Sequence, residues 1–279
     1  MEITVRRARV EDKARVLQVE ATATPNLRYL SVMFEHWVHD QVGELSVAEL
    51  DGILVGVAKF TILPDGSAWL EALRVSTEAQ GKGVGKRFYQ RFFELARERQ
   101  VSTMRMYTGI RNVASKGLAE RFGFHLAATY HGSGCSVELA PSKQAIDGFR
   151  VIDPAKAQAL LLPLGEQWDG FMVMNRTFYA VTPELCAAWA KAGQVYHDAE
   201  SNSLLVLGAR FQADQTLHIA CMSGDLKKCL TFAEQKAREL VVPKLTCLFS
   251  PKATAISQTL LQHGFQADPS DYIVMEVAI

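Results

Sequence analysis

Residues 80–85 read Gln-Gly-Lys-Gly-Val-Gly, and this alternation of glycines constrains the fold more than any other segment of the chain. An apolar stretch at 69–75 precedes the glycines with the composition of a strand, and apolar residues at helical spacing follow from Val84. A glycine-rich turn between a strand and a helix presents backbone N–H groups to an anion, with the positive end of the helix dipole behind them. The sequence therefore predicts a phosphate-binding loop.

Spacing excludes two familiar nucleotide loops. A P-loop ends in Gly-Lys-Ser/Thr, whereas Arg87 follows Lys86 here. A dinucleotide fingerprint needs a third glycine where this chain has Lys86, and it stands near the start of a βαβ unit rather than after three other strands. A strained turn without a ligand remains open at this point.

Composition narrows the class of protein. The 279 residues suffice for two domains, and the 30 basic and 30 acidic residues balance, so no overall field attracts nucleic acid or an anionic membrane. No apolar run is long enough to span a membrane, and the N-terminus does not resemble a signal peptide. Five scattered cysteines without a C-x-x-C pair favour a reduced, cytoplasmic protein. We expect no metal site, and either a monomer or a homodimer.

Hydrophobic periodicity predicts a mixed α/β fold in the first half of the chain. The expected strands are 3–7, 45–50, 53–63, 68–75, 103–107, 124–130 and 135–139, and the expected helices are 10–21, 30–40, 84–95 and 112–122. The polar residues 141–148 are predicted to be a domain junction, which gives domains 1–141 and 149–279.

Two signatures in this half resemble those of the GNAT N-acetyltransferase superfamily. The pattern Leu-Arg-Val followed by Gln-x-x-Gly-x-Gly at 73–85 resembles its acyl-CoA signature. Asn-x-x-Ser at 112–115, followed by Leu-x-x-x-Phe-Gly-Phe at 118–124, resembles its second signature, in the correct order along the chain. The order of strands and helices over residues 1–140 resembles the same family.

The resemblance implies acetyl-CoA as the co-substrate. Its diphosphate would bind the loop N–H groups, and its pantetheine arm would lie in a gap between the strand before the loop and the next strand. The residues implied for the cofactor are Leu73, Arg74, Val75, Gln80, Gly81, Lys82, Gly83, Val84, Gly85, Lys86, Asn112 and Ser115.

Glu71 is the candidate general base for an amine acceptor. A carboxylate on an apolar strand is costly unless it has a partner or a task, and some family members carry a base there. A salt bridge or an acceptor-binding anion is the alternative. Strict alternation along the strand predicts that Glu71 and Arg74 point to opposite faces.

The general acid is less clear from the sequence. The family's usual tyrosine lies seven residues after the asparagine, and that position is Ala119 here. Tyr107, at the end of the adjacent strand, is the candidate replacement, with Tyr130, His131 and water as alternatives.

The acceptor pocket is expected to be lined by Tyr29, Phe34, Trp37 and Tyr130. Short stretches at 29–30, 37–38, 71–75 and 81–84 are similar to the family's histidine N-acetyltransferase. The resemblance therefore implies an N-acetyltransferase acting by direct attack of a small primary amine, such as an amino acid. A CoA-binding regulatory module without turnover, suggested by Ala119, and a protein N-acetyltransferase are the alternatives.

The second half repeats the pattern more faintly. Strands are expected at 217–221, 245–249 and 272–277, and helices at 226–240 and 253–263. The equivalent loop, Met-Ser-Gly-Asp at 222–225, lacks the repeated glycines and carries an acid where phosphates would bind. Like-charge repulsion argues against CoA there. We therefore expect tandem GNAT folds, of which the second is degenerate and structural.

Overall fold

The computed structural model describes residues 2–24, 27–139 and 147–279. Unit 1 comprises residues 1–107, 112–125 and 275–279, and unit 2 comprises 108–111 and 126–274. The compact units thus differ from a division at 141–148 in where they assign 108–111, 126–139 and the last five residues. Most of that expected junction, residues 141–146, lies outside the described residues.

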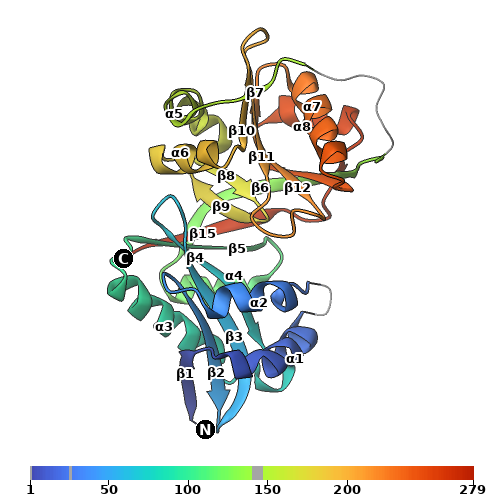
Figure 1. Cartoon of the computed structure of the whole chain (residues 1–279). Coiled ribbons are helices and arrows are strands. Elements are labelled where there is room, and N and C mark those ends of the chain that lie inside the picture. The colour runs from blue at the N-terminus through green and yellow to red at the C-terminus, as the bar shows by residue number, and fades with distance from the viewer. Residues whose placement is uncertain (1, 25–26, 140–146) are drawn as a thin grey trace. The chain divides into compact units, whose positions relative to one another are not determined.

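Unit 1 is built on a mixed sheet (Figure 1). Its strands, in spatial order, are β1 (Ile3–Arg7), β2 (Glu44–Leu50), β3 (Ile53–Ile62), β4 (Ala68–Val75), β5 (Thr103–Gly109) and the end of β15 (Tyr272–Ala278). Strands β1 to β4 pair antiparallel, whereas β4 and β5 are parallel. The position of each strand in the first 110 residues agrees with the sequence prediction to within two residues.

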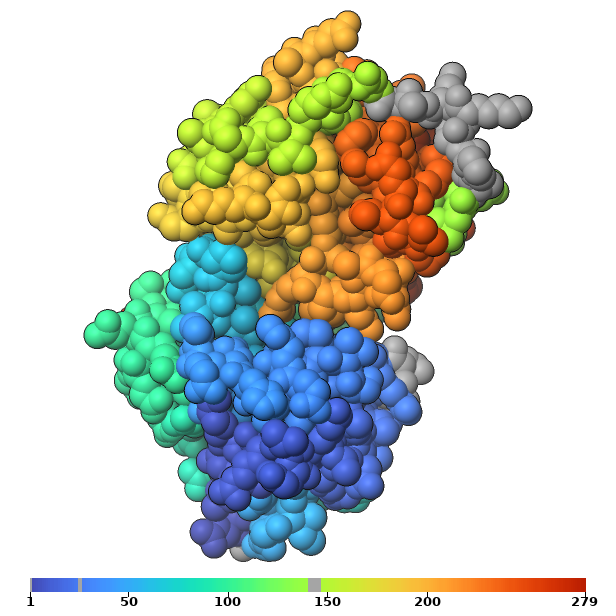
Figure 2. Space-filling view, in the orientation of Figure 1, coloured from blue at the N-terminus to red at the C-terminus, as the bar shows by residue number. Residues whose placement is uncertain are grey.

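Two helices cover each face of this sheet. Helices α1 (Lys13–Ala23) and α2 (Leu30–Val38) pack on one face and, in blue, form much of the surface of unit 1 seen in Figure 2. Helix α3 (Val84–Glu98) buries an apolar stripe against the other face, where Phe60 and Phe92 lie 6.3 Å apart. Helix α4 (Val113–Arg121) ends beside α3, with Tyr89 stacked on Phe122 at 4.9 Å.

Unit 2 repeats part of this order. Its sheet runs from the start of β15 through β6 (His125–Ser136), β13 (Lys244–Phe249), β12 (Leu217–Ser223), β11 (Ser203–Gly208), β10 (Val195–Asp198) and β7 (Arg150–Val151). The smaller strands are β14 (Gln266–Ala267), which pairs with β6, and the hairpin β8 (Phe171–Met174) and β9 (Thr177–Ala180). Its helices are α5 (Pro154–Leu161), α6 (Pro183–Lys191), α7 (Leu226–Glu239) and α8 (Thr254–Gln262). The series β12, α7, β13, α8, with parallel strands, matches β4, α3, β5, α4 of unit 1.

One predicted break in the chain is wrong. Residues 131–134 were expected to separate two strands, but β6 runs without interruption, and its register with β13 continues from Ser136 to His131. The glycines there allow neighbours to pack closely: a Cβ on Gly132 would collide with Asp268 and Tyr272. Glycine in a strand can mark a close approach as well as a turn.

No helix in the described part of the chain is both long and apolar enough to cross a membrane.

A buried ion pair anchors the α2 end of unit 1. The Lys59 side chain on β3 is fully buried, and its Nζ donates to Asp40 Oδ2 at 2.5 Å and to the Phe60 carbonyl at 2.7 Å. Burial alone would raise the pKa of Asp40, but the hydrogen bonds from Lys59 and the Gly43 N–H lower it below its usual value. Because a buried ammonium without a counter-ion is very unfavourable, Asp40 is required where Lys59 is buried.

We predict that Asp40→Ala lowers the free energy of unfolding by roughly 3–5 kcal/mol, whereas Asp40→Ala with Lys59→Met recovers most of that loss. Since the Asp40 pKa is depressed in the folded protein, its contribution is present above pH ~4 and is lost as the pH falls through the folded pKa. The double variant should lose less stability on acidification than the wild type. Urea denaturation at pH 7 and pH 4 measures both effects, and equal stability of the two variants would contradict the pairing.

Candidate active site

Strands β4 and β5 diverge shortly after they meet. Their parallel pairing is limited to Ala68 with Met104 and Trp69 with Arg105. Beyond that point Leu73, Arg74 and Val75 are half-exposed, although Ala68, Trp69 and Leu70 of the same strand are buried. An interior strand of a sheet normally has a neighbour on both sides, so the end of β4 presents an open edge with backbone groups available to a ligand.

A bulge in β4 sets the direction of the side chains at this edge. On β3, Val57 and Lys59 are two residues apart, but their partners Arg74 and Glu71 are three apart, so β4 carries one extra residue. Ala72 within the bulge has φ +55°. Residues directly opposite one another share a face of the sheet. Glu71 and Arg74 therefore point to the same face, and the alternation expected from the sequence is wrong here.

Glu71 is half-buried on the face that α1 and α2 cover. The Thr61 hydroxyl donates to Glu71 Oε1 at 2.5 Å, and the fully buried Lys59 stands opposite in the register. Thr61 was not anticipated, because its approach to Glu71 depends on the strand pairing. The Thr61 hydroxyl orients this carboxylate, and the residue opposite it is the lysine that pairs with Asp40.

Tyr29 lies over the same part of β4. Its ring packs edge-on against Trp37 at 5.9 Å, and the Arg74 guanidinium carbon is 5.7 Å from the ring centre. Burial raises the pKa of Tyr29 well above its usual value; the nearby Arg74 cation opposes this rise and the Glu71 carboxylate adds to it, and Tyr107 is also close enough to affect this pKa. The phenol is thus protonated at any physiological pH, and these four side chains form one cluster.

Tyr107 and Trp69 complete the cluster from the two diverging strands. Their rings are parallel to within 2°, with centres 6.0 Å apart. The composition of the strand predicts that Trp69 lies in β4, but it does not predict that Trp69 stacks on Tyr107. Tyr107 is placed two residues beyond the last β4–β5 pair, where the strands have separated.

A buried carboxylate fixes the position of Tyr29. Glu20 is 2% exposed, and its Oε1 accepts the N–H groups of Tyr29 at 3.0 Å and Leu30 at 3.1 Å. These donors belong to the start of α2, where an anion also interacts favourably with the helix dipole. The sequence gives no signal for this contact, because Glu20 reads as an ordinary residue near the end of α1.

The glycine loop ends at an uncapped helix. Gly83 is the N-cap of α3 with φ +94°, and among the described residues no side-chain hydrogen bond caps the start of this helix. Gly81 has φ +75°, and a Cβ built on it would meet no atom within 4 Å. Lys82 and Lys86 are exposed beside these glycines. Unpaired helical N–H groups, open space and nearby cations fit a diphosphate, as the sequence predicts.

The corresponding loop of unit 2 is closed by its own residues. Asp225 is the N-cap of α7, and its carboxylate accepts the Lys228 N–H at 3.0 Å. A Cβ on Gly224 would lie 2.6 Å from the Asn202 carbonyl oxygen, so chain fills the space beside it. A protein carboxylate thus occupies the place that an anionic ligand takes in a phosphate-binding loop.

The other residues that the sequence suggests for the acceptor and cofactor sites make contacts within the fold. Phe34 and Trp37 are buried in the core between α1, α2 and the sheet, so their packing role is evident. Asn112 caps α4 by accepting the Ser115 N–H at 3.2 Å, and Ala119 is fully buried. Tyr130 belongs to unit 2, where its buried hydroxyl donates to the carbonyls of Trp168 and Phe171.

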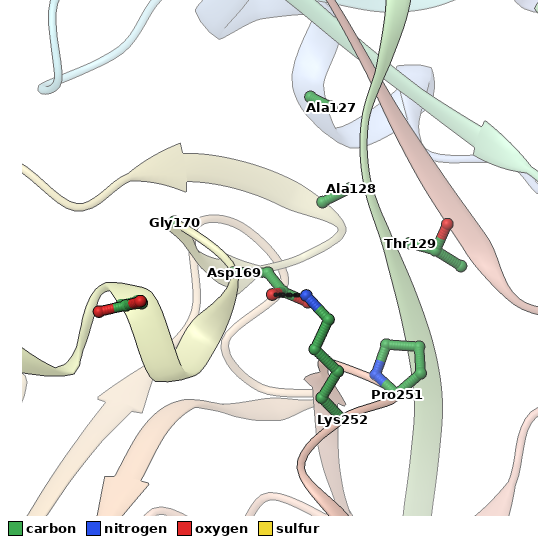
Figure 3. A pocket seen from close by; sticks show the side chains of 8 residues that line it. Ala127, Ala128, Thr129, Asp169, Gly170, Pro251 and Lys252 are labelled. Carbon is green, nitrogen blue, oxygen red and sulfur yellow. Dashed lines mark hydrogen bonds and ion pairs between the residues drawn. The ribbon is translucent and has the colours of Figure 1, made fainter.

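A separate cavity of about 490 Å³ lies within unit 2 (Figure 3). Its lining includes Asp169 and Lys252, which form an ion pair at 2.9 Å, drawn as a dashed line. Burial would raise the pKa of Asp169, but hydrogen bonds from Ser250 and Lys252 lower it. Because this pair satisfies itself, the cavity has no evident acid–base role. Within the described ranges, no three His, Cys, Asp or Glu side chains are grouped closely enough to hold a metal ion.

Comparison with known proteins identifies the first half. Residues 12–124 match the family model for the GNAT acetyltransferase family. No curated protein matches the sequence. Among solved structures, a GCN5-related N-acetyltransferase from Sphaerobacter thermophilus has a TM-score of 0.65 at 13% identity, with 99% of this chain and 95% of that chain covered. A structure from Thermoplasma acidophilum has a TM-score of 0.63 at 16% identity and covers 99% and 100%.

A third similar structure is a GCN5-related glucosamine N-acetyltransferase region in a fungal multi-domain β-N-acetylglucosaminidase. It has a TM-score of 0.67 at 13% identity and covers 99% of this chain and 38% of that one. At these identities the likeness shows the fold. Residues 12–124 are thus a GNAT acetyltransferase domain, within a mixed α/β fold that these structures match over nearly the whole chain.

We predict that the bulge tolerates glycine but not a β-branched residue at position 72. Ala72→Val places a branched side chain at φ +55° in a buried site and should lower the free energy of unfolding by about 2 kcal/mol or more. Ala72→Gly removes the strain and a buried methyl group, and should stay within about 1 kcal/mol of the wild type. Thermal and urea denaturation measure the difference, and equal stability of the two variants would contradict the left-handed backbone.

Proposed function

We propose that the protein is an acetyl-CoA-dependent N-acetyltransferase that acts on the primary amine of a small molecule. The observation that carries this proposal is the arrangement in unit 1 of an uncapped glycine loop, a diverging pair of strands and a carboxylate beside them. The family match to residues 12–124 supports the reaction class. The second unit, whose loop is closed by Asp225, serves as a structural partner in this proposal.

The residues of the loop and of β4 fit the cofactor. The N–H groups of residues 81–86 would bind the diphosphate, with Lys82 and Lys86 beside it. The backbone of Leu73 and Val75 would pair with the pantetheine amides, in competition with the side chains of Arg74 and Gln80, which donate to the carbonyls of Leu73 and Val75. When bound, acetyl-CoA supplies a thioester whose carbonyl carbon bonds to the amine nitrogen as the carbon–sulfur bond breaks. The Asn112 carboxamide holds the start of α4 in this arrangement.

Glu71 would take the proton that the attacking amine must lose. The Thr61 hydroxyl donates to Glu71 Oε1 and helps to orient the carboxylate, whose oxygens are hydrogen-bond acceptors. Tyr107 is the candidate donor of a proton to the departing sulfur, because it lies on the diverging side of β5. Ala119 cannot take that role, since a methyl group carries no proton to give.

The alternative is a CoA-binding regulatory module without turnover. The alanine at position 119 favours it, because the usual acid is missing. The half-buried Glu71 favours an enzyme, because a carboxylate at this site has no evident use in binding CoA, which is itself an anion.

We predict that Gly81→Leu weakens acetyl-CoA binding at least tenfold, because the side chain would fill the space in front of the helical N–H groups. Gly52→Leu is the matched control: Gly52 has φ +81° and equally open surroundings, but it lies in the β2–β3 turn. Both variants should lose a similar amount of stability, about 1–2 kcal/mol, from the positive φ. Calorimetric titration with acetyl-CoA separates them, and equal affinity in the two variants would remove the loop from the site.

We predict that Glu71→Gln lowers the rate of thiol release by roughly 10²–10⁴-fold near neutral pH, the range for loss of a general base. The deficit should shrink above the pKa of the acceptor amine, since a free amine no longer needs deprotonation. Thiol release from acetyl-CoA across amino acids, polyamines and aminoglycosides measures it.

Glu120→Gln, which removes an exposed carboxylate on α4, is the control and should leave the profile unchanged. Tight acetyl-CoA binding without thiol release for any amine would favour the regulatory module. Release with the same pH profile in Glu71→Gln and wild type would exclude Glu71 as the base.

A further inference from the structure

Arg74 has an unusual hydrogen-bond environment for an arginine in unit 1. Its Nε is buried and has no hydrogen-bond partner among the described residues. Its Nη1 donates to the carbonyl of the preceding Leu73 at 3.1 Å, and its Nη2 is 3.4 Å from the Tyr29 hydroxyl. A buried guanidinium donor without an acceptor is unfavourable, and a site that binds an anion explains it.

Three other arginines of unit 1 each contact at least two carboxylates. The pairs are Arg6 with Asp12 and Glu49, Arg91 with Glu44 and Glu94, and Arg105 with Asp65 and Glu276. Arg74 instead contacts uncharged oxygens and the face of the Tyr29 ring. The ring and the strand hold the guanidinium plane in place while its charge remains without a counter-ion from these partners.

The bulge at Ala72 places this cation next to the candidate base. Glu71 and Arg74 share a face, and their partners Lys59 and Val57 are two residues apart on β3, which corresponds to about 6–7 Å along a strand. The site therefore presents an anion and a cation side by side. The protonated Tyr29 hydroxyl lies beside the cation and adds a neutral donor.

We propose that Arg74, with the Tyr29 hydroxyl, binds the carboxylate of the acceptor, so that the substrates are α-amino acids. This rests on the proposed acetyl transfer to a small amine. The amine and carboxylate of an α-amino acid are joined through one carbon, so the two groups can reach the neighbouring anion and cation together. A polyamine or aminoglycoside instead brings further positive charge toward Arg74. Arg74 is thus a specificity-determining residue for the acceptor rather than a ligand of CoA.

The test compares amino acids with their carboxamides, which keep the amine and lose the anion. L-Histidine, L-phenylalanine and L-lysine are measured against L-histidinamide, L-phenylalaninamide and L-lysinamide by thiol release. The wild type should prefer the acid by roughly 10- to 100-fold in kcat/KM, the value of a charged hydrogen bond. The comparison is stringent, because the amine of a carboxamide is the easier one to deprotonate.

Arg74→Gln should remove this preference by raising KM for the acid, while kcat/KM for the carboxamide and KM for acetyl-CoA stay within about threefold of the wild type. Arg74→Lys should restore part of the preference, because the charge remains. Arg15→Gln, which removes an exposed guanidinium of unit 1 that donates to the Leu54 carbonyl, is the control and should keep the wild-type ratio.

Three outcomes overturn the inference and differ from one another. Equal kcat/KM for acid and carboxamide in the wild type would show that no carboxylate is recognised. A preference that survives in Arg74→Gln would move the carboxylate site elsewhere, and a raised KM for acetyl-CoA with an unchanged ratio would assign Arg74 to the cofactor. Failure of the proposed function itself looks different, because the wild type would then release no thiol with any of the six amines.

Discussion

The extra residue in β4 is the constraint on which the candidate site depends. It interrupts the antiparallel register with β3 between Val57 and Lys59 and holds Ala72 at φ +55°. A non-glycine residue in this conformation carries about 1–2 kcal/mol of strain. The same irregularity coincides with the separation of β4 from β5 and turns Arg74 to the face that already holds Glu71. Without it the strand would be an ordinary member of the sheet, and the carboxylate and guanidinium would lie on opposite sides.

Buried charges around the bulge make that strained arrangement stable. Lys59, opposite Glu71, is neutralised by Asp40, and Glu20 accepts two N–H groups at the start of α2. Each of these groups would be unfavourable alone, and each fixes an element that carries a residue of the site. Lys59 fixes β3 to the end of α2, and Glu20 fixes Tyr29 over β4. The site is therefore oriented by partners that lie outside it, as a site that must hold substrate atoms in register requires.

The sequence predicts the strands and helices of unit 1 well, and the side-chain directions of β4 poorly. Periodicity is a local property, so Ile3–Arg7, Ala68–Val75 and the start of α3 could be located from composition alone. The glycine loop is also local, because three alternating glycines have few other uses. The bulge in β4 is not a local property, because it depends on how many residues of β3 lie opposite those of β4. Thr61, Glu20 and the Trp69–Tyr107 stack depend on pairing in the same way. The glycines of β6 led to the wrong prediction of a break at 131–134. In a sequence, a glycine that is needed because a neighbouring side chain packs closely cannot be distinguished from a glycine that is needed for a turn.

The two helix N-termini explain why chemistry is assigned to one unit. Both α3 and α7 follow a strand of a parallel pair, and in both cases a glycine with positive φ stands near the start. In α7 the Asp225 carboxylate takes the N–H of Lys228, so the protein supplies its own anion. In α3 the N-cap is Gly83, which has no side chain to do so, and the first N–H groups need an external acceptor. A chain that keeps one loop open and closes the other stabilises its second unit without a ligand. Of these two loops, the one before α3 is the one whose first N–H groups are not capped by its own N-cap side chain, and it follows the strand whose bulge aligns Glu71 with Arg74.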